Sequence, residues 1–238
     1  MATTGGALFA VLGTVAVSSL VILLGWIPPR GRISLGLGRF WARALLVCSG
    51  VRVRTRFEAP LDPRRSYVFL ANHQSFYDIP ALLAVIPSGA RFAAKKSLFR
   101  IPVFGWAMAV AGFIPIDRQD RSRAREAFAA AAARLKAGTS VLFFPEGTRT
   151  RDGAMGPFER GGFLLALRSG LPIVPVGIAG CRAVMPKGRP TVAPGVVSVG
   201  FGSPIDVGAY GVRRRDELMA EVRSRIAQLA GLEAEASG

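Results

Sequence analysis

The chain of 238 residues contains one histidine, two cysteines and only 15 acidic residues, against 31 lysines and arginines. One histidine and two cysteines far apart do not supply a metal-ligand pattern, so the sequence predicts no metal site. Cys48 and Cys181 lie in apolar or glycine-rich surroundings, which predicts buried thiols in a reducing compartment. If a step at neutral pH needs a side chain that both takes and gives a proton, His73 is the one imidazole available.

The shortage of acidic residues leaves a formal net charge of +16, although half of the residues are apolar. A chain that is both apolar and basic favours an anionic membrane surface, a nucleic acid or an acidic ligand as its partner. The sequence has no zinc-finger spacing, aromatic RNP-type motif or basic helix pattern, so we expect no nucleic-acid partner. An anionic phospholipid surface or an acidic ligand is the better prediction.

Residues 1–50 are predicted to form a helix pair that anchors the protein to a membrane. Ala7 to Ile27 contains no charged residue, close to the ~20 residues that a helix needs to cross a bilayer. This stretch ends with Trp26 and Ile27 and is followed by several arginines, which predicts the inner (cytoplasmic) membrane with the remaining chain on the cytoplasmic side. A second amphipathic segment, roughly Leu35 to Val51, is expected to lie along the interface or to pair with the first helix. Two buried helices of a soluble fold are the alternative.

From residue 51 to 231, short apolar runs alternate with helical stretches, before a tail at 232–238 that we expect to be frayed. This alternation predicts an α/β fold, with a mixed sheet flanked by helices. The expected strands are Tyr67–Ala71, Arg91–Ala94, Phe113–Ile116, Ser140–Phe144, Pro172–Ile178 and Val196–Phe201. The expected helices are Ile79–Val85, Pro102–Ala111, Ser122–Lys136, Gly161–Ser169 and Arg214–Leu229.

The run Asn72-His73-Gln74-Ser75-Phe76-Tyr77-Asp78 connects a predicted strand to a predicted helix. On one unbroken helix, side chains five positions apart point roughly 140° apart. His73 and Asp78 therefore meet only if His73 lies in the turn and Asp78 in or near the first helical turn, as the pattern predicts. Asp78 can then hold the ring in one tautomer, like the acid of a catalytic triad. A histidine with a purely structural role fits this pair equally well.

Three further runs place charged residues just after predicted strands, at the edge where α/β folds gather their sites. In the run 143–149, Arg149 offers planar donors suited to a phosphate, and Glu146 would orient Arg149 or accept from a substrate hydroxyl. Lys95 and Lys96 precede a predicted helix start at Ser97, and a phosphate could be held there. The run 112–118 ends in a further arginine. Solvated loops with salt bridges are the alternative.

Taken in order, these runs resemble one family. The order is Asn-His-four residues-Asp, Lys-Lys-Ser-Leu-Phe, Gly-Phe-Ile-Pro-Ile-Asp-Arg, Phe-Pro-Glu-Gly-Thr-Arg and Ile-Val-Pro-Val. Each run alone is weak, but the ordered set is specific. It is similar to the glycerolipid acyltransferases, in particular the bacterial 1-acyl-glycerol-3-phosphate acyltransferases, over about residues 50 to 205. The N-terminal helix pair also resembles the membrane anchor of bacterial members.

The resemblance implies transfer of a fatty acyl chain from acyl-CoA or acyl carrier protein to the 2-hydroxyl of lysophosphatidate, without a cofactor. His73 would be the general base, oriented by Asp78. Arg118 would belong to a second motif tied to the acceptor. Arg149 and Lys96 would contact the acceptor phosphate, although the choice between Lys95 and Lys96 stays open. The acceptor-binding motif would comprise Glu146, Gly147, Thr148 and Arg149.

Three other functions compete with this one. A sister acyltransferase for a lyso-ornithine lipid or another lysophospholipid would keep every catalytic residue and change only the pocket. A membrane-bound hydrolase would need an activated nucleophile, and no Gly-x-Ser-x-Gly frames Ser75. A non-catalytic lipid-binding protein would tolerate loss of His73. The sequence favours direct acyl transfer in a ternary complex, without an acyl-enzyme.

Overall fold

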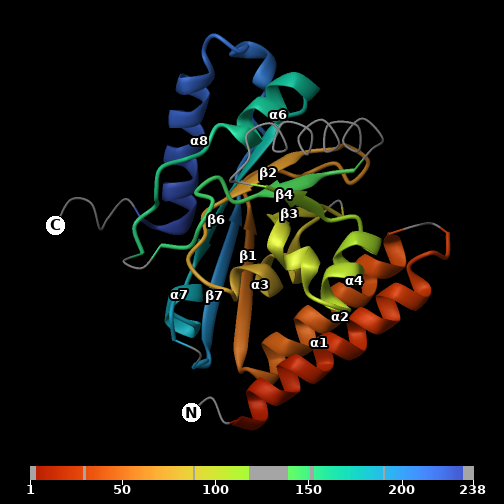
Figure 1. Cartoon of the computed structure of the whole chain (residues 1–238). Coiled ribbons are helices and arrows are strands. Elements are labelled where there is room, and N and C mark those ends of the chain that lie inside the picture. Colours follow the sequence, from red (N-terminus) through yellow and green to blue (C-terminus); the bar gives the residue numbers. More distant parts are fainter. Residues whose placement is uncertain are drawn as a thin grey trace.

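The computed structural model describes residues 4–28, 31–87, 89–117, 139–150, 153–189 and 191–232. In this part of the chain, seven strands form one mixed sheet flanked by helices, which confirms the predicted fold class (Figure 1). The predicted helix Ser122–Lys136, Arg118 and the tail 233–238 lie outside the described residues.

The sheet has the spatial order β1-β7-β6-β2-β5-β3-β4. Neighbouring strands from β6 to β4 are parallel, so β2 to β6 all end at the same edge, whereas β7 runs antiparallel to β6. Their bounds are β1 (Val51–Phe57), β2 (Val68–Ala71), β3 (Arg91–Lys95), β4 (Ile114–Ile116), β5 (Val141–Phe143), β6 (Ile173–Ala179) and β7 (Gly195–Phe201). The six predicted strands are confirmed, and β1 is an additional strand at one side of the sheet.

Helices cover both faces of the sheet. Val68 and Leu70 of β2 belong to a core shared with α6 and α8, whereas Phe69 and Ala71 belong to a core shared with α2 and α3. This division follows from the alternation of side chains along a strand. The described helices are α1 (Thr4–Leu24), α2 (Arg32–Cys48), α3 (Asp78–Val85), α4 (Phe104–Val110), α6 (Gly161–Ser169), α7 (Cys181–Val184) and α8 (Arg215–Ala230). Short 3₁₀ helices are η1 (Lys96–Arg100) and η2 (Val207–Ala209).

The two N-terminal helices pack on each other and on α4 (Figure 1). Trp41 Nε1 of α2 donates to Thr14 Oγ1 of α1 at 3.1 Å, and Val21 of α1 packs against Ala107 of α4. The second apolar segment therefore pairs with the first helix. It ends at Cys48, earlier than predicted, because Val51 already begins β1.

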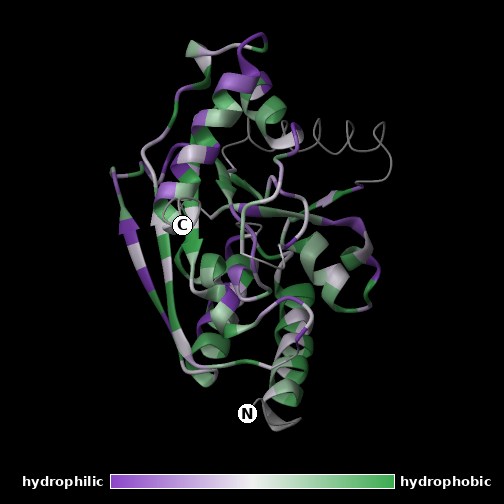
Figure 2. Ribbon diagram, turned by 90° about the vertical axis from the view of Figure 1, so that its left-hand side faces the viewer, coloured by the Kyte–Doolittle hydropathy of each residue, from purple (hydrophilic) through white to green (hydrophobic). Residues whose placement is uncertain are grey.

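The outer face of α1 is apolar and largely exposed (Figure 2). Gly6–Leu24 is the one helix among the described residues that is long and apolar enough to cross a membrane. Cys181 is buried as predicted, but Cys48 is exposed at the end of α2, so the prediction of two buried thiols is wrong for Cys48. Cys48 is the last residue of the amphipathic helix α2, and it lies on the side of the helix that faces away from the core.

Candidate active site

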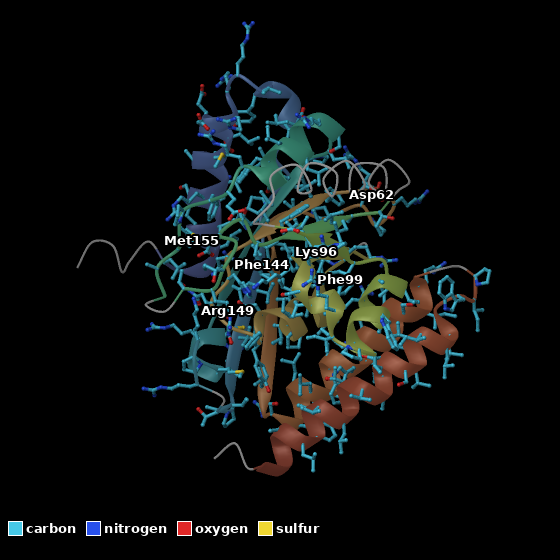
Figure 3. All side chains as sticks on the ribbon, in the orientation of Figure 1. Asp62, Lys96, Phe99, Phe144, Arg149 and Met155 are labelled. Carbon is cyan, nitrogen blue, oxygen red and sulfur yellow. The ribbon has the colours of Figure 1, made fainter. Side chains whose placement is uncertain are left out.

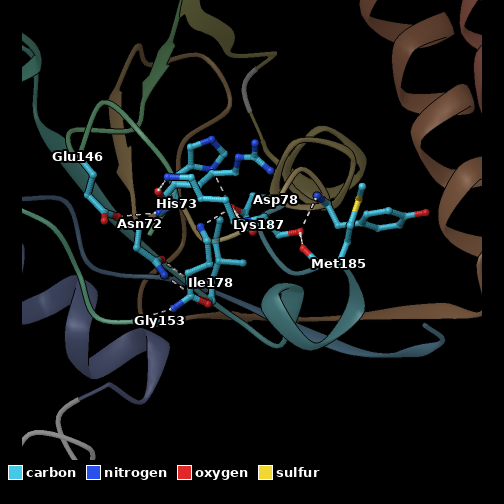
Figure 4. A network of polar contacts seen from close by, with 12 residues as sticks. Asn72, His73, Asp78, Glu146, Gly153, Ile178, Met185 and Lys187 are labelled. Atoms are coloured by element: carbon cyan, nitrogen blue, oxygen red, sulfur yellow. Dashed lines mark hydrogen bonds and ion pairs between the residues drawn. The ribbon is translucent and has the colours of Figure 1, made fainter. Parts of the chain in front are cut away.

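The site begins where Asn72 ends the pairing of β2 with β6. Its buried side chain donates from Nδ2 to the carbonyl of Ile178 at 2.9 Å and accepts from the Ile178 amide at 2.7 Å (Figure 4). The Asn72 side chain thus makes the two hydrogen bonds to Ile178 of β6 that a further residue of β2 would otherwise make with its backbone. The backbone is free to leave the sheet, and this places His73 above the strand ends.

We expect Asn72→Ala to destabilise the protein, because it leaves two buried backbone groups of Ile178 unpaired at about 1–3 kcal/mol each. Chemical unfolding measures the free energy of unfolding directly. Ser224→Ala, at an exposed position of α8, serves as the control. Equal unfolding free energies for the two variants would show that Asn72 does not hold the end of β2.

His73 and Asp78 form a tight pair at the start of α3 (Figure 4). Asp78 is fully buried, and its Oδ2 lies 2.7 Å from Nδ1 of His73, whose side chain is 16% exposed. The same oxygen accepts the backbone amides of Gln74 at 2.7 Å and Ser75 at 2.8 Å. The loop thus wraps around one carboxylate, and the ring is fixed further by stacking on Phe144, with centroids 4.1 Å apart.

This arrangement determines which ring nitrogen is basic. An ionised carboxylate can only accept hydrogen bonds, so Nδ1 of His73 carries the proton that it donates to Asp78. Nε2 is then the unprotonated nitrogen of the neutral ring, and it can take a proton from a hydroxyl group. A cation formed in this way is stabilised by Asp78, as in other carboxylate–histidine pairs.

Glu146 supports His73 through the backbone. It is 7% exposed, and its Oε1 accepts the His73 amide at 2.7 Å while Oε2 accepts the Gly156 amide at 2.8 Å. Burial raises the pKa of its carboxyl above the usual value, and these two hydrogen bonds act in the opposite direction. Both carboxylate oxygens are therefore engaged by the protein, which gives Glu146 a positioning part in addition to the acceptor contact expected from the sequence.

For Glu146→Gln we expect kcat to fall by about 10²-fold with little change in KM for the acceptor, because one amide donor would face the new NH₂ group and displace His73. Glu159→Gln is the matched control, since Glu159 is exposed in the same loop. Steady-state kinetics over a range of acceptor concentrations separates the two constants. A raised KM with an unchanged kcat would instead make Glu146 an acceptor contact.

A cavity of about 430 Å³ opens beside His73. Arg149, Phe76 and Lys95 line it, together with mainly apolar residues from β3, η1 and α4. The guanidinium of Arg149 lies 3.6 Å from the centroid of the Phe76 ring, and burial lowers the pKa of Arg149 from its usual value far above neutrality. Figure 3 labels Phe144 and Arg149 near the centre of the molecule. A cation and a base thus share one apolar cavity.

The two lysines differ in their surroundings. Lys95, the last residue of β3, lines the cavity, whereas Lys96 Nζ pairs with Asp117 at 3.2 Å. Ser97 lies inside the 3₁₀ helix η1, whose N-cap is Lys95, so the prediction of a helix start capped by Ser97 is wrong by two residues. The geometry favours Lys95 over Lys96 as a group that faces the cavity.

The remaining predicted residues belong to the loop after β5. Gly147 is buried with φ of 69°, a left-handed conformation that favours glycine, and it lets the chain turn sharply between Glu146 and Arg149. Thr148 is exposed and also lines the cavity. Arg118 falls outside the residues for which the structure gives a position.

Cys181 lies close to the histidine pair but cannot act as a nucleophile there. Burial raises the pKa of its thiol, and the neighbouring Asp78 carboxylate raises it further, so the thiol stays protonated. Within the described ranges no group of three or more histidine, cysteine, aspartate or glutamate side chains could hold a metal ion.

The comparisons with known proteins agree with this geometry. Residues 52–179, more than half of the chain, match the Acyltransferase family model. The chain is 31% identical over 227 residues to 1-acyl-sn-glycerol-3-phosphate acyltransferase of Escherichia coli, covering 93% of this chain and 91% of that protein. The crystal structure of the 1-acyl-sn-glycerophosphate acyltransferase PlsC from Thermotoga maritima superposes with a TM-score of 0.80 at 26% identity, over 98% of this chain and 94% of that one.

The chain belongs to the Acyltransferase family, which confirms the resemblance seen in its motifs. A chloroplastic 1-acyl-sn-glycerol-3-phosphate acyltransferase of Brassica napus is 40% identical over 166 residues, or 69% of this chain. The chain spans less than half the length of this plant relative, 46% of it.

Sequence reasoning missed the parts played by Asn72 and Phe144, and it named Lys95 only as an open alternative to Lys96. Asn72 offered a signal, since an asparagine directly after an apolar strand is suited to local backbone hydrogen bonds. Phe144 had none, because its stacking on His73 joins two loops that are far apart in the sequence.

Proposed function

We propose that this protein transfers a fatty acyl chain from acyl-CoA or acyl carrier protein to the 2-hydroxyl of 1-acyl-glycerol-3-phosphate, giving phosphatidate. The observation that carries this proposal is the His73–Asp78 pair opening into a cavity that also contains Arg149 and Lys95. The names of the bacterial relatives supply the substrate class.

In the proposed reaction, Nε2 of His73 removes the proton of the acceptor hydroxyl as its oxygen attacks the thioester carbonyl carbon. The tetrahedral intermediate then collapses and expels the thiolate, and the imidazolium of His73 transfers its Nε2 proton to this leaving group. General-base catalysis of this kind contributes about 10²–10⁴-fold. The protonated thiol of Cys181 and the buried Ser75, whose hydroxyl donates to the Met185 carbonyl, favour direct transfer without an acyl-enzyme.

Arg149 and Lys95 are proposed to hold the acceptor phosphate, with Lys95 replacing the Lys96 expected from the sequence. Arginine presents a planar fork to a phosphate and lysine a point charge. Apolar residues shared by this cavity and a smaller one between α1, α2 and α4 lead away from His73, and they suit a fatty acyl chain. The shared residues are Ile79, Phe104, Met108 and Phe113.

Arg149→Ala should raise KM for lysophosphatidate by about 10–10²-fold, since hydrogen bonds to charged groups contribute about 1.5–3 kcal/mol. KM for the acyl donor should change much less. Arg160→Ala, exposed at the start of α6, is the control. Equal effects on donor and acceptor would remove Arg149 from the phosphate site.

We further propose that α1 attaches the protein to the inner membrane with the α/β domain on the cytoplasmic side. Many apolar side chains of α1 are exposed, as are Phe40 and Val47 of α2 and Trp106 of α4, and exposed apolar side chains in such number are of the kind that marks membrane contact. Helix α1 packs along both α2 and α4. We therefore propose that α1 enters one leaflet together with the domain and does not cross the bilayer as a separate transmembrane helix. A two-tailed product would then stay in the lipid phase.

A further inference from the structure

A second, polar recess lies at the same edge of the sheet, on the other side of the catalytic loop. It encloses about 630 Å³ between α7, the carboxyl end of α8 and the loop after Arg149. We call it the α7 recess. Among the described residues its charged side chains are Arg182, Lys187 and Arg189, and none of the described residues that line it is an aspartate or a glutamate. The volume falls within the range of small-molecule sites, about 300–1,000 Å³.

The recess adjoins the histidine pair through two direct connections. Gln74, the residue after His73, lines the recess and donates from Nε2 to the carbonyl of Gly153 at 3.0 Å. Lys187 Nζ donates to the backbone carbonyl of Arg149 at 2.5 Å, so the loop that carries Arg149 contacts both the recess and the catalytic cavity. The underlying strands, β6 and β2, are parallel neighbours that both end here.

The arginines of the recess have charges that the described protein does not neutralise. Neither Arg182 nor Arg189 forms an ion pair within the described ranges, whereas Arg214 and Arg215 on α8 each pair with an acid. The Arg182 guanidinium also lies against Gly153, whose added Cβ would come within 3.0 Å of Nη1. Unpaired guanidinium groups around a concave surface are suited to phosphate groups.

We infer that the α7 recess binds the phosphate groups of the nucleotide portion of acyl-CoA, an inference that rests on the proposed acyl transfer. The apolar cavity on one side of His73 would take the acyl chain and the acceptor. The donor's phosphates would bind on the other side, and its pantetheine arm would bring the thioester to His73. The carboxyl end of α8 disfavours anions, so the phosphates belong at the α7 wall, with the arginines.

The shape of the recess favours a nucleotide over a carrier protein as the source of these phosphates. A protein partner needs a broad surface, on the order of 800 Å² on each side, with a rim that excludes water. Here the cations line a concave space between four segments of the chain. An adenosine bearing a 3′-phosphate and a 5′-diphosphate matches both this concavity and its charge.

The test is the double variant Arg182→Glu/Arg189→Glu, assayed in the full-length protein with acyl-CoA as donor. KM for acyl-CoA should rise by about tenfold or more, with KM for lysophosphatidate unchanged. Adenosine 3′,5′-bisphosphate should inhibit the wild type competitively against acyl-CoA and inhibit the variant at least tenfold less well. Arg64→Glu/Arg65→Glu makes the same change in net charge at exposed positions before β2, and it should behave like the wild type.

The outcomes separate this inference from the proposed function. Active protein with the same KM for acyl-CoA in both double variants would overturn the α7 recess as the nucleotide site. Transfer from acyl carrier protein alone would also overturn it. If the wild type transferred no acyl chain at all, the proposed function would fail. Calorimetric binding of adenosine 3′,5′-bisphosphate, present in the wild type and lost in Arg182→Glu/Arg189→Glu, would then still support the recess, and no binding would overturn it.

Discussion

Replacing His73 by alanine is expected to lower the rate of phosphatidate formation by about 10²–10⁴-fold, because the acceptor hydroxyl loses the base that takes its proton. The fold should persist, since Asp78 keeps its hydrogen bonds from the amides of Gln74 and Ser75. The initial rate with labelled acyl-CoA measures the effect, and the unfolding midpoint verifies that the variant is folded.

His73→Asn is the sharper partner variant. An asparagine amide can donate to Asp78 from about the position of Nδ1 but cannot accept and release a proton. It should be as inactive as His73→Ala and closer to the wild type in stability. Activity in His73→Asn, or wild-type activity in His73→Ala, would exclude His73 as the general base.

Asp78→Asn should lower kcat by about 10⁴-fold, the effect known for the equivalent change in a catalytic triad. An asparagine can present its NH₂ group to His73, which reverses the tautomer and moves the proton to Nε2. The hydrogen bonds that the backbone amides of Gln74 and Ser75 donate to this side chain also lose their charged acceptor, which should lower the free energy of unfolding by on the order of 3 kcal/mol. Kinetics and chemical unfolding on the same preparation measure both effects.

Asp216→Asn is the control for this change, because Asp216 is also an acid in the first turn of a helix but is exposed and far from His73. Its activity should equal that of the wild type. The catalytic part of the prediction requires that kcat falls while the KM for both substrates stays close to the wild-type value. A fall in stability with unchanged kcat would make Asp78 a purely structural residue.

Much of the fold could be predicted because it depends on local patterns. Continuous apolar runs identified the buried strands, and the charged residues directly after them belong to the edge where parallel strands end. The meeting of His73 with Asp78 followed from the same reasoning, since a strand-to-helix turn allows a contact that one helix forbids. The region that matches the Acyltransferase family, residues 52–179, contains these same runs.

Strand β1 shows where the pattern was present but weak. Val51, Val53 and Thr55 alternate with three arginines, which is the period of a strand with one polar face. The arginines are tolerated because β1 is at the side of the sheet, where one face is open to solvent. Predicting a strand here required knowing that it pairs with β7, far away in the sequence.

Other features depend on contacts through space that no motif reports. Adjacent residues at a strand end point in different directions, so only the register of β3 decides that Lys95 faces the cavity and Lys96 meets Asp117. Glu146 accepts hydrogen bonds from backbone amides, and the side chains named in the sequence do not reveal which backbone amides lie nearby. The α7 recess joins residues from four segments that are far apart in the sequence, and of these only Gln74 belongs to a recognised motif.

The central proposal is acyl transfer to lysophosphatidate, and the most direct test offers the purified protein a panel of lysolipids with labelled acyl-CoA or acyl carrier protein. The panel contains lysophosphatidate, a lyso-ornithine lipid and other lysophospholipids. Phosphatidate is the expected main product with the wild type, and His73→Ala should not form it above background. Product formed only from another lysolipid, or phosphatidate formed equally well by His73→Ala, would contradict the proposal.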